Sequence, residues 1–166
     1  MQVPIRKPGK YTHDKPDPHM TQAKFDELKA KMERLKNYSQ PRAAIEVRRL
    51  AEMGDLSDNF AYSLAKGRLR GINQRIFDIE EHLKQAIIIQ SKGSSSLVQL
   101  GSRVTVEVNG QQKIYQILGS SETNPTQGVI SHNSPIGAAL MNGCVGEIIT
   151  TTINGKKVVY KIVSIQ

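Results

Sequence analysis

The chain has 166 residues and a formal net charge of +8, from 23 Lys and Arg against 15 Asp and Glu, with a pI near 9.7. This length allows one or two small domains, and the positive charge favours anionic partners, either nucleic acid or a protein that handles it. No apolar run approaches the roughly 18 residues of a membrane span, and the start lacks the apolar stretch of a signal peptide. We therefore expect a cytoplasmic protein with no membrane partner.

Cysteine and histidine usage limits the chemistry further. The single cysteine, Cys144, excludes an internal disulfide. The four histidines, at positions 13, 19, 82 and 132, are scattered along the chain, with no second cysteine to complete a ligand set. This pattern argues against a zinc site.

The first half of the chain predicts a flexible tail and then a helical hairpin. Residues 1–20 contain four prolines and show no apolar period, as is typical of flexible segments. Apolar residues then recur every three or four positions from Phe25 to Leu35, and again from Leu69 to Ala86. Two such seams in one chain predict an antiparallel two-helix coiled coil over residues 21–90, with its tip at residues 54–58.

Proline at position 41 interrupts the first helix of this hairpin. A proline inside a helix removes one backbone hydrogen bond and clashes with the preceding turn. We therefore expect a kink or a short break between Tyr38 and Pro41.

Charge is sorted along the predicted rod. The base is nearly neutral, the middle has nine basic residues against the single acid Glu46, and the tip is acidic. A solvated helix face is the commoner meaning of a charge run, but this segregation favours sides that follow phosphate or an acidic surface. We call the basic middle the basic shaft; its candidate contacts to RNA or to a protein partner are Arg48, Arg49, Lys66, Arg68 and Arg70.

The tip reads G-D-L-S-D-N-F-A-Y from residue 54 to residue 62, and Asp55 and Asp58 are its candidate functional residues. Their ordinary alternative is helix capping, with Asp55 or Ser57 as the N-cap and Asp58 favoured by the helix dipole. Two carboxylates on an exposed turn would bind Mg²⁺ weakly, so we expect no metal or cofactor bound by the chain alone. Phe60 is expected to pack on the seam between the helices.

After a linker at residues 91–96, the apolar period changes from 3.6 to 2. Asn109-Gly110 and Asn154-Gly155 each lie between alternating segments, which predicts two β-hairpins with tight turns. A short helix is expected from Pro135 to Met141. Residues 97–166 therefore predict a compact α+β domain.

Two motifs in these settings carry a family resemblance. The tip motif at 54–62, followed by R-I-x-x-I-E-x-x-L at 75–83, resembles the tip and second arm of the Gre transcript cleavage factors, GreA and GreB. I-S-H-N-S-P-I-G-A-A-L at 130–140 is similar to the second signature of that family. The resemblance covers about residues 21–166.

This resemblance implies a monomeric accessory factor of bacterial RNA polymerase. An FKBP-like C-terminal domain would dock at the rim of the secondary channel, and the coiled coil would pass down it. Asp55 and Asp58 would then act on the Mg²⁺ of the polymerase active centre and stimulate cleavage of the backtracked nascent RNA 3′ end. The remaining residues implied are Ser57, Asn59 and Tyr62 as tip support, and Ser134, Pro135 and Gly137 in the docking domain.

Two alternatives belong to other functional classes. The family usually has glutamate where Asp58 stands, and the shorter carboxylate leaves open a homologue that occupies the channel and regulates polymerase without stimulating cleavage. An FKBP-like domain also suggests a prolyl isomerase. Such a cleft needs an aromatic floor, and Tyr115 and Tyr160 are the only aromatic residues after position 96, so we discount this activity.

Overall fold

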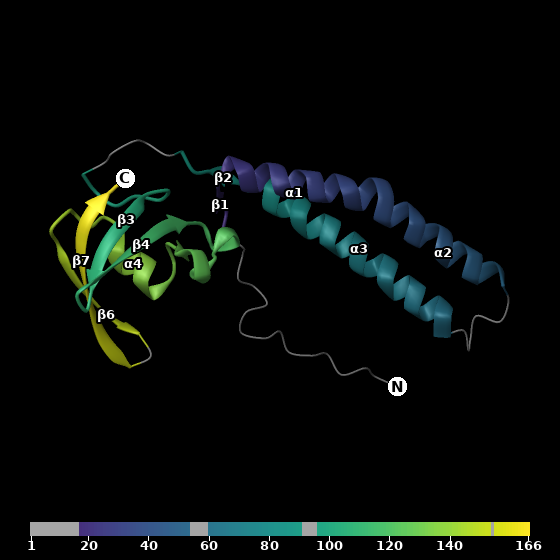
Figure 1. Cartoon of the computed structure of the whole chain (residues 1–166). Helices are drawn as coiled ribbons and strands as arrows, with labels where there is room; N and C mark the ends of the chain where they lie inside the picture. The colour runs from purple at the N-terminus through teal and green to yellow at the C-terminus, as the bar shows by residue number, and fades with distance from the viewer. Residues whose placement is uncertain (1–16, 54–59, 91–95, 154) are drawn as a thin grey trace, which may run out of the picture.

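A computed structural model describes residues 17–53, 60–90, 96–153 and 155–166, which form a helical rod and a sheet domain (Figure 1). The α+β organisation expected from the sequence, a helical hairpin followed by a sheet domain, is confirmed. Most of the expected tail, the tip and most of the linker lie outside these described residues.

Two antiparallel arms form the rod. The first arm comprises α1 (Gln22–Arg34), a π-helical turn (Leu35–Ser39) and α2 (Gln40–Glu52), and the second is α3 (Phe60–Lys84). Hydrogen bonds and ion pairs link the two arms, and their positions rise along the first arm as they fall along the second. They join Lys36 to Glu80 at 3.4 Å, Gln40 to Asn73 at 2.9 Å and Glu46 to Arg68 at 3.3 Å.

The π-helical turn is the form that the expected interruption takes. Pro41 lies at the start of α2, and the amide of Gln40 donates to the carbonyl of Leu35, five residues back. A wider turn at this point accommodates a residue that lacks an amide hydrogen and whose ring would clash with a regular preceding turn. The helix therefore continues past Pro41 instead of breaking.

Small side chains let the two arms approach closely in the outer half of the rod. Among the described residues of the hairpin, those that are buried are Ala43, Leu50, Ala65 and Ile76, so two of these four are alanines. Gly67 and Gly71 lie on α3 facing open space, with no atom near the position of an added Cβ. Because these glycines have no side chain, they keep the outer rod slender. No neighbouring atom requires a glycine at either position.

Gly67→Ala is expected to raise the free energy of unfolding by about 0.5–1 kcal/mol, because alanine loses less backbone entropy in a helix than glycine does. Urea denaturation would measure the change. Gly110→Ala is the matched control: its Cβ also meets open space, but its φ of +75° disfavours alanine, so this variant should be destabilised. A loss of stability in Gly67→Ala would contradict the expectation.

The second domain is a five-stranded sheet with one short helix against it (Figure 1). Strand order is β5-β4-β3-β7-β6, and all neighbours are antiparallel except the parallel pair β4 and β5. The strands are β3 (Arg103–Val108), β4 (Gln111–Leu118), β5 (Val129–Ser131), β6 (Ile148–Ile153) and β7 (Lys156–Ile165), and the helix is α4 (Pro135–Leu140).

Both predicted hairpins are present. Asn109 and Gly110 have φ of 50° and 75°, as a two-residue turn between β3 and β4 requires. The second hairpin joins β6 and β7, although Asn154 lies outside the described residues. The core beneath the sheet consists of Val98, Val104, Val106, Val108, Ile117, Ile130, Leu140, Tyr160 and Ile162.

A small parallel sheet, not expected from the sequence, lies at the base of the rod. β1 (His19–Met20) pairs with β2 (Ile87–Ile88), and the side chain of Met20 is fully buried. Residues 19 and 20, which the sequence pattern assigns to the flexible tail, are therefore part of the fold. Strands of two residues are too short to show an apolar period, and the partner of this one lies far away in the sequence.

Candidate functional site

The ends of α2 and α3 that flank the tip motif lie at the end of the rod far from the sheet domain (Figure 1). α2 ends at Glu52 and α3 begins at Phe60, so the chain between them joins the outer ends of two antiparallel helices. Asp55, Ser57, Asp58 and Asn59 all belong to this connection and lie outside the described residues. The roles of these four residues therefore stay predictions.

The described residues on either side of the tip expose large apolar side chains. Phe60 is 80 % exposed, so the expectation that it packs on the seam is wrong. Met53 and Leu64 are also exposed. Tyr62 is half-buried, and the ammonium group of Lys66 lies 5.8 Å from its ring centroid, within the range of a cation–π interaction. The described residues that flank the tip motif thus present apolar surface at the end of the rod.

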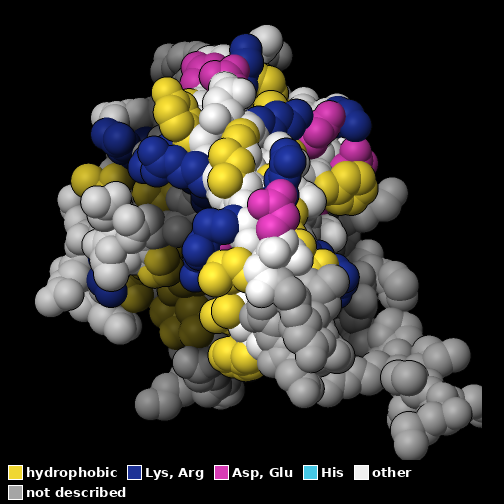
Figure 2. Space-filling model, turned by 90° about the vertical axis from the view of Figure 1, so that its right-hand side faces the viewer, with side chains coloured by type: hydrophobic (Ala, Val, Ile, Leu, Met, Phe, Trp, Pro, Cys, Tyr) yellow, Lys and Arg dark blue, Asp and Glu magenta, His cyan; other side chains and the backbone are white. Residues whose placement is uncertain are grey.

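Basic side chains on the shaft are exposed and only weakly engaged. Figure 2, which looks onto the end of the rod, shows Lys and Arg side chains distributed around it. Arg48 pairs with Glu52 at 2.9 Å and Arg68 pairs with Glu46 at 3.3 Å, both at the surface. Exposed pairs of this kind contribute about 0–1 kcal/mol, so each arginine can exchange its partner for a phosphate at little cost. Arg49, Lys66 and Arg70 are also exposed.

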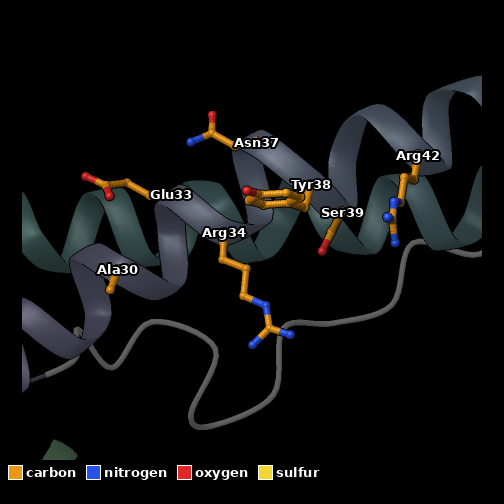
Figure 3. A pocket seen from close by; sticks show the side chains of 7 residues that line it. All are labelled: Ala30, Glu33, Arg34, Asn37, Tyr38, Ser39 and Arg42. Atoms are coloured by element: carbon orange, nitrogen blue, oxygen red, sulfur yellow. The ribbon is translucent and has the colours of Figure 1, made fainter.

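A groove beside the π-helical turn adds residues that were not among the predicted shaft contacts. Figure 3 shows the side chains of Arg34 and Arg42 extending to the same side of the first arm, with Tyr38 between them. The groove measures about 580 Å³, and the Tyr38 ring is exposed. The sequence placed both arginines in the basic stretch but could not show that the widened helical turn groups them around an aromatic ring.

The predicted docking residues build the start of α4. Ser134 is the N-cap: its hydroxyl accepts from the Gly137 amide at 3.0 Å and donates to the Ser131 carbonyl at 2.7 Å. Gly137 is buried so close to Ser131 that a Cβ there would lie 2.0 Å from the Ser131 carbonyl oxygen. Pro135 is exposed at the first position of the helix. Ser134 and Gly137 therefore shape this loop, and Pro135 is the one of the three that is open to a partner.

Ser134→Ala is expected to lower the free energy of unfolding by about 1–2 kcal/mol, because it removes the N-cap and leaves the Gly137 amide without its acceptor. Urea denaturation would measure the loss. Ser134→Thr is the matched control, since it keeps the hydroxyl and should retain most of the stability. Equal stability of the alanine variant and the parent chain would contradict the proposed role of the cap.

The base of the rod is joined to the sheet domain by side-chain hydrogen bonds. Thr21 donates to Glu122 through its amide at 2.7 Å and its hydroxyl at 2.5 Å. The carboxylate of Asp17 accepts from the amide and hydroxyl of Ser120 at 2.8 and 3.2 Å. Burial alone would raise the pKa of Asp17, but hydrogen bonds from Ser120 and His19 and the nearby His132 together lower it. An ionised Asp17 thus helps to hold the two parts together.

Family models match both parts of the chain. The model described as transcription elongation factor, N-terminal, matches residues 19–88, and that described as transcription elongation factor, GreA/GreB, C-term, matches residues 93–166. The chain belongs to the GreA/GreB family of transcription elongation factors. The resemblance seen in the motifs is therefore confirmed, and the two matched regions coincide with the rod and the sheet domain.

Curated relatives in the GreA/GreB family extend the match over most of the chain. It is 40 % identical over 149 residues to the transcription elongation factor GreA of Macrococcus caseolyticus (strain JCSC5402), covering 88 % of this chain and 94 % of that protein. It is 35 % identical over 150 residues to GreA of Staphylococcus carnosus (strain TM300), covering 89 % and 94 %. Among solved structures, GreA factor homolog 1 of Thermus thermophilus is 27 % identical, with 89 % and 97 % coverage and a TM-score of 0.41. Among the described residues, no helix is both long enough and apolar enough to span a membrane.

Proposed function

We propose that this Gre-family chain binds RNA polymerase in the cytoplasm and stimulates the polymerase's own cleavage of backtracked nascent RNA, so that arrested complexes resume elongation. The observation that carries the proposal is the position of the Asp55-Asp58 motif at the connection between α2 and α3, in a chain that matches the family along both of its parts. The rod carries the aspartates into the secondary channel, and the sheet domain binds at the channel rim.

The chemistry of two carboxylates fits an accessory role. Alone, Asp55 and Asp58 are too few to hold Mg²⁺, which keeps several waters and demands near-octahedral oxygen ligation. Beside a metal that the polymerase already binds, they can help to hold a second Mg²⁺ and orient the attacking water, as in two-metal phosphodiester hydrolysis. The chain itself therefore supplies ligands and a proton acceptor, and the polymerase supplies the reaction site.

The surfaces of the rod support entry into a channel lined by nucleic acid or acidic protein. Its outer half packs through alanines and carries open glycines, which keeps it slender. The exposed Arg49, Lys66 and Arg70 supply positive potential that draws the rod toward phosphate and weakens with salt.

The residue at position 58 supports a second candidate function. Asp58 stands where the Gre family usually has glutamate, and its carboxylate reaches less far by one methylene. If that shortfall breaks the alignment of the water or the metal, the chain occupies the channel and regulates polymerase without stimulating cleavage.

A halted, backtracked elongation complex separates the two functions. Binding of the chain to the cognate polymerase and release of the RNA 3′ fragment are measured in the same samples, with the polymerase's unassisted cleavage as the baseline. Binding together with accelerated cleavage supports the first function. Binding at the baseline cleavage rate supports the channel-occupying regulator, and absence of binding contradicts both.

A further inference from the structure

At the base of the rod, two side chains of one segment, Asp17 and His19, meet a third, His132, that lies far away in the sequence. Asp17 Oδ1 lies 3.0 Å from His19 Nδ1, and Asp17 Oδ2 lies 3.5 Å from His132 Nδ1. One ligand atom from each of the three residues falls within 4.8 Å of the other two. The histidine rings are 5.4 Å apart between centroids and inclined at 80°, so they approach each other edge to face. The fold therefore brings together two of the four histidines whose scatter in the sequence argued against a metal site.

The cluster is sheltered and its members are held in place. The side chains of Asp17, His132 and His19 are 6, 20 and 34 % exposed. Ser120 donates to Asp17 Oδ2 through its amide and its hydroxyl. His82 Nε2 lies 3.0 Å from the Asp17 backbone carbonyl oxygen, which ties the segment before β1 to α3. Hydrogen-bond partners of this kind orient metal ligands in known sites and are needed for full affinity.

These residue types and spacings suit a transition metal. Two imidazoles and a carboxylate are ligands of Zn²⁺ and of neighbouring divalent ions, whereas Mg²⁺ selects oxygen ligands. Ligands about 2.0–2.1 Å from Zn²⁺ in a tetrahedron lie roughly 3.3–3.4 Å from one another. The separations of 3.0 and 3.5 Å between the Asp17 oxygens and the two Nδ1 atoms lie on either side of that value.

We propose that Asp17, His19 and His132 bind a divalent transition metal ion, with Zn²⁺ as the reference ion and a fourth position open to water. Asp17 and His19 belong to the segment that enters the rod, whereas His132 follows β5 of the sheet domain. The ion therefore links the rod to the sheet domain, as the hydrogen bonds between Thr21 and Glu122 also do. Binding displaces any protons on the two Nδ1 atoms and stabilises the folded chain by mass action. The site is separate from the tip and does not depend on the cleavage function.

Calorimetric titration of the metal-free full chain with Zn²⁺ tests the site. We expect one equivalent to bind with a Kd in the micromolar range or tighter, and no binding of Mg²⁺ at this site. His132→Gln and Asp17→Asn should each weaken Zn²⁺ binding by about 100-fold, since loss even of an outer partner costs roughly 10–100-fold. His82→Gln keeps a group that can donate to the Asp17 carbonyl, so it should weaken Zn²⁺ binding less than either ligand variant does. Asp78→Asn is the matched control, because it neutralises an exposed carboxylate on α3 that accepts from Gln74, and its affinity for Zn²⁺ should stay within about threefold.

X-ray absorption at the zinc edge of the parent chain keeps the test independent of how the variants fold. The expected spectrum contains two imidazole nitrogens and oxygen ligands about 2.0–2.1 Å from zinc. A spectrum with fewer than two imidazoles, the absence of stoichiometric Zn²⁺ binding, or undiminished affinity in a folded His132→Gln variant would overturn the proposal. In each of those cases the three residues form a hydrogen-bonded cluster without a metal.

Discussion

Asp55→Ala and Asp58→Ala are each expected to slow RNA cleavage in backtracked complexes by at least about 100-fold, with polymerase affinity unchanged within about threefold. The physical reason is that each carboxylate acts only when it lies beside the second metal or the attacking water. Alanine supplies neither a ligand nor a proton acceptor, while the rod and the docking domain remain as they are. The measurement is the rate of 3′ fragment release at saturating factor, with affinity determined separately by competition for the polymerase.

Asp78→Asn provides the matched control for loss of an acid. Asp78 is exposed on α3 near the base of the rod, and its carboxylate accepts from Gln74 within the same helix. This variant should cleave as the parent chain does. Asp58→Glu, which restores the longer carboxylate usual in the family, should cleave at least as fast as the parent. If both alanine variants cleave normally, neither carboxylate is needed for cleavage and the proposed carboxylate role is wrong.

Local patterns in the sequence were sufficient to predict the main elements. The apolar seam of α3 and the alternating valines of β3 reflect packing on one face, and each pattern extends over at least two turns or several residue pairs. Asn109-Gly110 predicted a tight turn because both residues tolerate positive φ, and both adopt it.

Features that depend on contacts between distant segments were missed. β1 has two residues and pairs with β2 across the whole hairpin, so no local period could reveal it. His19, in β1, also lies beside His132. These two histidines look scattered in the sequence because they are far apart along the chain. The sequence predicts a kink or a short break near the widened turn at Leu35–Ser39, because proline indicates where a helix is disturbed but not which hydrogen-bond pattern results.

The candidate site shows the same contrast between features that a local motif predicts and features that depend on contacts. The tip could be predicted from the motif and from the two apolar seams, but whether Asp55 caps the helix or binds a metal depends on the partner. For the docking loop, the motif named Ser134, Pro135 and Gly137 without distinguishing contact from support. The structure shows how their surroundings differ, because Ser134 and Gly137 face Ser131 within the domain while Pro135 is exposed.

Gly137→Ala is expected to lower the free energy of unfolding by about 3 kcal/mol or more and to weaken polymerase binding by at least tenfold. The added Cβ would lie 2.0 Å from the Ser131 carbonyl oxygen and 2.9 Å from its carbon, and backbone atoms cannot rotate away as a side chain could. That same carbonyl accepts from the amide and the hydroxyl of Ser134. Relieving the clash would therefore disturb the N-cap and move the loop that presents Pro135.

Ala138→Gly is the control for this substitution, since it exchanges the same two residue types in the same helix at an exposed position. It should cost no more than about 1 kcal/mol, the helix-propensity difference, and leave polymerase binding nearly unchanged. Thermal unfolding and a polymerase-binding titration would measure both variants. A Gly137→Ala chain as stable as Ala138→Gly would show that the Ser131 backbone can move aside. Normal binding despite a large loss of stability would instead place the polymerase contact away from this loop.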